Sequence, residues 1–173
     1  IAQCLVGSEM CIRDSGYTDR IDVDYDILKI AVIERHKNTH HIGLGYIKGY
    51  GLKKGAVATS ISHDSHNIIV VGTNEEDMAF AANHIVRNHG GITVVEDGAV
   101  KGDVLLAIAG IMSDDSLVNV NRDLESAKAA AYALGVSEGI DPFMTLSFMA
   151  LPVIPSLRIT TRGVFDVTSQ RYV

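Results

Sequence analysis

Short apolar runs separated by glycine and polar breaks recur along the chain, a pattern that is typical of strands joined by short connections. Residues 22–36 are acidic and then strongly apolar, which fits a buried strand or a short helix, because periodicity alone does not separate the two. Further strands are predicted at residues 57–61, 68–71, 92–95, 104–108 and 160–167.

A glycine-rich run at residues 42–51 places glycine at positions 43, 45, 49 and 51. Glycine at alternate positions of a strand removes the side chains from one face of that strand. We therefore expect another backbone segment or a ligand to lie close against this face. A nucleotide-binding glycine loop fits poorly, because the glycines lie within the strand-like run and not between a strand and a helix.

Helical spacing of apolar residues occurs in two places. Thr73 and Glu76 form a capping box for a first helix, which the glycine pair at residues 90–91 ends. A second helix is predicted within residues 117–134 and begins near Asn121.

Turn signals and connection lengths define the fold class. Asp97-Gly98 predicts a hairpin, whereas residues 141–148 are interpreted as apolar packing or one wall of a pocket. Parallel strands need crossovers of about a dozen residues, and the early connections are shorter. The sequence therefore predicts an α+β fold, a mostly antiparallel sheet with two or more helices packed on it.

The 173 residues suffice for one domain with a core, and the net charge of −6 argues against a general nucleic-acid binder. No apolar run approaches the roughly 20 residues that cross a bilayer, so we expect no membrane partner. The two cysteines, Cys4 and Cys11, indicate no disulfide scaffold and fit a reducing, cytoplasmic location.

Residues 1–15 have no clear period and begin without methionine. We interpret them as a non-native, adapter-like leader on a fragment of a longer protein. Residues 16–173 then form the domain of interest.

The strongest candidate for chemistry is a polar run between two apolar strands, made up of His63, Asp64, Ser65 and His66 and followed by Asn67. Such a run lies at a sheet end or in a cleft, where functional residues concentrate. In a strand the two imidazoles face opposite sides, so only a turn lets them converge. They provide too few ligands for a metal unless Glu34 or His36 joins them. Adjacent residues cannot form a hydrolase triad, and cleft-lining and purely structural roles both remain open.

A second candidate, Glu34-Arg35-His36, directly follows an apolar run and also lies at the end of an element. Arg35 is suited to bidentate binding of a carboxylate or phosphate, so the three residues are weak substrate-binding candidates. The alternative is a solvated strand end.

These motifs resemble, in order, the C-terminal domain of bacterial adenine deaminases. The resemblance extends over about residues 24–173 and is carried by Glu34-Arg35-His36, Ile42-Gly43-Leu44-Gly45, residues 49–56, His63-Asp64-Ser65-His66-Asn67, Gly72-Thr73-Asn74, Gly90-Gly91, residues 109–113, residues 141–148, residues 151–155 and Thr161-Arg162-Gly163.

The resemblance implies membership of the amidohydrolase superfamily and, for the intact enzyme, hydrolysis of adenine to hypoxanthine and ammonia in purine salvage and adenine catabolism. It implies a divalent metal, manganese or iron, held by an upstream (β/α)₈ barrel and not by this chain. A barrel takes about 250 residues, so we expect this chain alone to be inactive. We expect the upstream barrel as its partner and a homo-oligomeric enzyme.

Three roles for this chain remain open. The histidine run either helps to close or shape the active-site cleft, or belongs to a non-catalytic packing and oligomerisation module. A free-standing metal-binding domain would need three or more ligands around one point.

Overall fold

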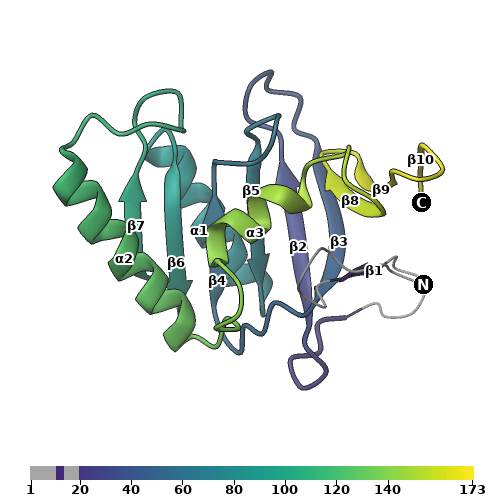
Figure 1. The fold of residues 1–173 in the computed structure, drawn as a ribbon, viewed down its shortest axis with the longest axis horizontal. Coiled ribbons are helices and arrows are strands. Elements are labelled where there is room, and N and C mark those ends of the chain that lie inside the picture. The colour runs from purple at the N-terminus through teal and green to yellow at the C-terminus, as the bar shows by residue number, and fades with distance from the viewer. Residues whose placement is uncertain (1–10, 14–19) are drawn as a thin grey trace.

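The computed structural model describes residues 11–13 and 20–173. Within them it forms ten strands and three helices (Figure 1): β1 (Cys11–Arg13), β2 (Ile27–Ile33), β3 (Ile42–Lys48), β4 (Ala56–Thr59), β5 (Ile68–Gly72), α1 (Glu75–Arg87), β6 (Gly91–Glu96), β7 (Ala99–Leu105), α2 (Leu117–Ala133), α3 (Pro142–Met149), β8 (Leu157–Thr160), β9 (Gly163–Asp166) and β10 (Arg171–Tyr172).

The described strands form one seven-stranded sheet in the order β1-β3-β2-β5-β4-β6-β7 and a three-stranded sheet in the order β10-β9-β8. Every neighbouring pair in both sheets is antiparallel. The predicted α+β class and antiparallel sheet are therefore confirmed.

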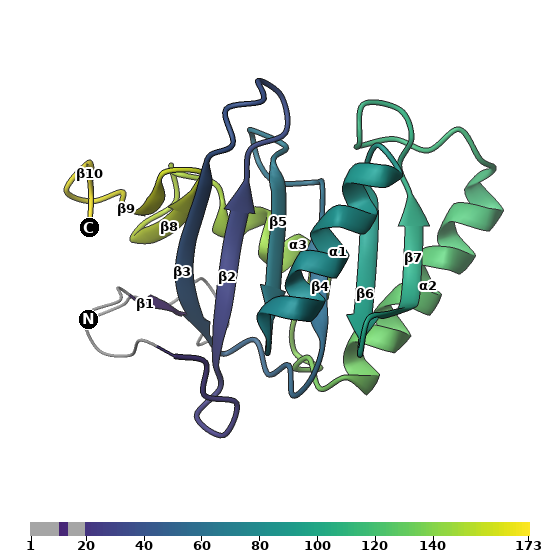
Figure 2. The same ribbon diagram turned by 180° about the vertical axis from the view of Figure 1, so that it is seen from behind.

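Helices cover both faces of the large sheet. α1 packs on β4, β5 and β6 on one face, whereas α2 packs on β7 and β6 and α3 on β4 and β5 on the other. Figures 1 and 2 show the two faces in turn. Two buried clusters result: a larger one under α2 and α3 that includes Phe143 and Leu146, and a smaller one under α1 that includes Met78 and Ile85.

Residues 27–33, whose pattern fitted a strand or a helix, are strand β2. Ile30 and Val32 belong to the cluster under α2 and α3, whereas Ala31 belongs to the cluster under α1. Burial on both faces removes the alternation that marks a half-exposed strand, so the periodicity did not identify it.

The glycine-bearing face of β3 is covered by a second backbone segment. The sequence had predicted either a backbone segment or a ligand there. The hairpin of β8 and β9 lies against it, and a Cβ added to Gly43 would be 1.7 Å from the carbonyl oxygen of Thr160. A Cβ on Gly45 would be 3.1 Å from Cγ2 of Val164. The glycines therefore admit a packed hairpin.

Several boundaries differ from the prediction. Asn74, not Thr73, caps α1, because its side chain accepts a hydrogen bond from the backbone N–H of Asp77 at 2.7 Å. α2 begins at Leu117, four residues earlier than expected, because Ser116 caps it. The hairpin turn at Asp97-Gly98 is confirmed, but the strand after it is Ala99–Leu105 and not residues 104–108.

Two C-terminal elements were missed or merged. Residues 142–149 form helix α3, capped by Asp141, whose carboxylate accepts from the backbone N–H groups of Phe143 and Met144. Residues 160–167 are not one strand, because a turn separates β8 from β9.

The predicted leader at residues 1–15 lies largely outside the described residues, and its assignment stays a prediction. Residues 11–13 do pair with β3. No helix in the described part of the chain is long and apolar enough to cross a membrane.

We expect Gly43→Ala to lower the free energy of unfolding by about 3 kcal/mol, because the added methyl group overlaps the Thr160 carbonyl of the packed hairpin. Gly139→Ala is the control, because a Cβ there meets nothing within 4 Å; we expect a change within about 0.5 kcal/mol. Urea unfolding of both variants checks this, and equal effects would show that the close approach carries no energetic weight.

Candidate functional site

The order of the antiparallel strands gathers distant segments at one end of the large sheet. Strands β2, β4 and β7 end there, and β5 and β6 begin there, at the upper end in Figure 1. The two sequence-predicted motifs, residues 34–36 and 63–67, therefore lie side by side. The loop at residues 106–116, which follows β7 at the edge of the sheet, reaches the same region.

Arg35 connects these three segments. Its Nε donates to the carbonyl oxygen of His66 at 2.5 Å, and its Nη2 donates to the carbonyl oxygen of Ala109 at 2.7 Å. Its backbone N–H donates to Oδ1 of Asn67 at 3.3 Å. The guanidinium thus holds the two loops in place through main-chain carbonyls, a role that the sequence did not indicate. Its predicted substrate contact stays a prediction.

Residues 63–66, named here the His63–His66 turn, bring both imidazoles to one region. The ring centroids of His63 and His66 lie 6.0 Å apart, and the ring of His63 lies 5.2 Å from that of Phe148 on α3. The backbone N–H of His63 donates to the carbonyl oxygen of Ser147 at 3.2 Å, which fixes the turn against α3. Asp64 and Ser65 between them are exposed.

His66 is held in its neutral form. Burial lowers the pKa of its imidazole first, and the nearby His63 and the charge of Arg35 lower it further. The backbone N–H of Ser62 points at Nδ1 of His66 from 3.4 Å, which requires a lone pair on that nitrogen. The turn therefore presents an uncharged imidazole at neutral pH.

Glu34 organises the loop that follows β2. Its carboxylate accepts hydrogen bonds from the backbone N–H groups of Thr39, His36 and Lys37. These hydrogen bonds, of which the one from Thr39 has the largest effect, lower the pKa of Glu34 to about 2. Nε2 of His36 lies 2.7 Å from the carbonyl oxygen of Ser65, so this nitrogen carries the proton and donates.

Two residues outside the predicted set complete the arrangement. The hydroxyl of Ser60 donates to the carbonyl oxygen of Gly110 at 2.5 Å and accepts from the backbone N–H of Gly91 at 2.8 Å. A Cβ on Gly110 would be 2.6 Å from Nη1 of Arg35, so glycine is needed beneath the guanidinium. A polar serine at the end of an apolar strand was the available signal for Ser60.

A cavity of about 420 Å³ adjoins the His63–His66 turn. Asp64 and Ser65 line it from the turn, Val32 from β2, and Ala150 and Pro152 from the segment after α3. The turn therefore borders a cavity with polar groups on one wall and apolar groups on others. This geometry suits contact with a small, partly polar ligand.

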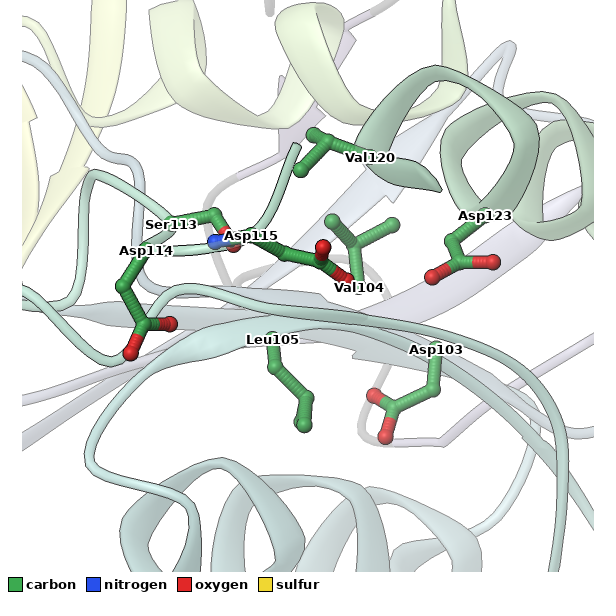
Figure 3. Close-up of a pocket in the computed structure, with 8 residues that line it drawn as sticks. All are labelled: Asp103, Val104, Leu105, Ser113, Asp114, Asp115, Val120 and Asp123. Carbon is green, nitrogen blue, oxygen red and sulfur yellow. The ribbon is translucent and has the colours of Figure 1, made fainter. Parts of the chain in front are cut away.

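The described residues contain no group of three or more histidine, cysteine, aspartate or glutamate side chains able to hold a metal ion. A larger pocket of about 610 Å³ at the β7 edge of the sheet is acidic (Figure 3), lined in part by Asp103, Asp114, Asp115 and Asp123. The carboxylate of Asp114 points away from those of Asp103 and Asp123. Within the described part of the chain, neither site fits a metal.

The fold and site together define an α+β domain that gathers histidine-bearing loops at one open sheet end. The sequence model of the family described as "Adenine deaminase C-terminal domain" matches residues 8–171. The chain belongs to this family.

Three relatives named adenine deaminase show how much of the protein this chain represents. It is 50% identical over 152 residues to adenine deaminase of Bacillus subtilis (strain 168). The aligned residues make up 88% of this chain and 26% of that relative. It is 48% identical over 159 residues to that of Bacillus licheniformis, covering 92% and 28%. For adenine deaminase 1 of Rhizobium etli the identity is 49% over 153 residues, covering 88% and 27%. The chain thus spans about a quarter of the length of these curated relatives.

We expect His66 to titrate below the value of about 6.5 that is usual for an exposed histidine. Since the folded protein disfavours the protonated ring, the unfolded state binds the proton first as the pH falls. Stability is therefore present above about pH 6.5 and decreases as the pH falls toward the lower folded pKa.

The same titration tests the influence of Arg35. Arg35→Met removes a positive charge that lowers the pKa of His66, so that pKa should rise. Arg122→Met, on the exposed side of α2, should leave it unchanged. An NMR titration of the imidazole resonances measures both, and a His66 pKa at or above 6.5 in the unsubstituted protein would contradict the described environment.

Proposed function

We propose that this chain is the C-terminal part of an adenine deaminase, which hydrolyses adenine with one water to hypoxanthine and ammonia. The family membership and the printed names of the relatives support this proposal. Because the chain spans about a quarter of those relatives, the reaction belongs to the intact polypeptide. We propose that this chain alone is inactive.

The intact enzyme, in this proposal, is a cytoplasmic homo-oligomer of the amidohydrolase superfamily that serves purine salvage. A divalent manganese or iron ion would activate the attacking water on the upstream barrel. The described residues of this chain contain no group of side chains that fits such an ion. We propose that this chain instead helps to bind, orient and shield the substrate.

The observation that carries a cleft-lining role is the meeting of residues 34–36, 63–67 and 109–110 at one sheet end, fastened by Arg35. The neutral His66 and the exposed Asp64 offer hydrogen-bonding groups suited to the ring nitrogens and amino group of a purine. The apolar side chains of Ile108 and Met112 beside them are exposed, so this end presents an apolar surface suited to burial against another domain.

The alternative is a non-catalytic packing or oligomerisation module in which the turn is purely structural. The hydrogen bonds from the side chains of Arg35 and His36 to backbone carbonyls of the turn favour it, because such bonds can serve to hold a structural turn in place. The side chains favour the cleft-lining role, because neither His63 nor Asp64 forms a side-chain hydrogen bond or ion pair with another described residue. Within the described part of the chain these two side chains are therefore left to contact solvent, a ligand or another domain.

We expect His63→Asn and Asp64→Asn in the intact enzyme to lower kcat/KM for adenine at least about tenfold, a loss of about 1.4 kcal/mol in transition-state stabilisation. Metal content and the unfolding midpoint should stay unchanged. His40→Asn is the matched control, because His40 is exposed in the neighbouring loop. If all three variants turn over adenine equally, the packing module is the correct account.

A further inference from the structure

One face of the large sheet is only partly covered. α1 lies over β4, β5 and β6, and Figure 2 shows β2 and β3 beside it without a covering helix. Ile42 and Leu44 on β3 are 54% and 52% exposed on this face. Strand register places Ile33 opposite Ile42 and Ala31 opposite Leu44. These four residues are named here the β2–β3 face.

The β2–β3 face is continuous with the interior. Ala31 belongs to the buried cluster under α1, and Ile33 packs against that cluster from its edge. The charged neighbour on β2, Lys29, is paired with Glu75 in the first turn of α1. An aliphatic strand pair with its neighbouring charge neutralised favours an apolar partner over water.

We propose that the β2–β3 face is buried against the upstream part of the same polypeptide. This inference rests on the part of the proposed function that joins the chain to an upstream domain, and it does not depend on the reaction. About three quarters of the length of the relatives lies outside the matched part, which supplies a large partner. Residues 20–26 lead into β2 at Ile27, so the connection enters the strand that carries Ala31 and Ile33, at the end away from Ile33.

The tether selects this occupant over a second copy of the chain. A domain of the same polypeptide is held near its docking face at an effective concentration that reaches the millimolar range for a short flexible connection. A second copy would have to compete from solution at its total concentration. An exposed aliphatic face on the strand that the connection enters is therefore covered first by the domain attached to it.

Cysteine labelling of the intact polypeptide tests the proposal. Leu44→Cys and Ile42→Cys place a thiol on the β2–β3 face, and Val100→Cys is the control. Val100 is also a strand residue, 38% exposed, but it lies on β7 at the opposite edge of the sheet and at the end of that strand away from the candidate site. Peptide mass spectrometry reads the reaction of each introduced thiol with a water-soluble maleimide, under native conditions and after unfolding.

We expect Leu44→Cys and Ile42→Cys to react at least about tenfold more slowly than Val100→Cys in the native polypeptide and equally fast once unfolded. The two positions keep the test valid if one variant fails to fold. Equal native rates would overturn the proposal. Protection that disappears on dilution would also overturn it, because a second copy would then be the occupant.

The labelling result is independent of the reaction. If the unsubstituted polypeptide does not deaminate adenine but the two thiols are protected, the proposed reaction fails and the docking face stands. If it deaminates adenine and the thiols react freely, only the docking face fails.

Discussion

The candidate site depends on the half-buried guanidinium of Arg35. It binds the carbonyl oxygens of His66 and Ala109, residues that are 31 and 74 positions away along the chain. Burial lowers its pKa, yet an arginine remains charged at any physiological pH. Hydrogen bonds from a charged donor are about twice as strong as neutral ones, so this one side chain can hold two loops at the sheet end.

The sequence identified elements with local signals and missed those that tertiary packing determines. The antiparallel sheet followed from short connections, and the glycine face of β3 indicated a close approach. Helix α3 was missed because eight mostly apolar residues buried on several sides have no helical period, although Asp141-Pro142 is a good helix start. The sequence identified both site motifs. It did not show that they lie together, because this depends on the pairing of β2 with β5, two strands that are far apart in the sequence.

The structure gives the chain two distinct surfaces. At the sheet end, Arg35 fixes the histidine turn beside a cavity, whereas Ile42 and Leu44 form an apolar face along the sheet. A domain that spans about a quarter of its relatives would use the face to anchor itself and the end to shape a cleft.

Hydrogen exchange in Arg35→Met tests the role of Arg35 most directly. If the guanidinium holds both loops, the amides of residues 62–67 and of residues 108–112 should exchange at least about tenfold faster in this variant, with the core strands unchanged. Unchanged exchange in both segments, or faster exchange in only one, would contradict the claim that this side chain joins the loops into one site.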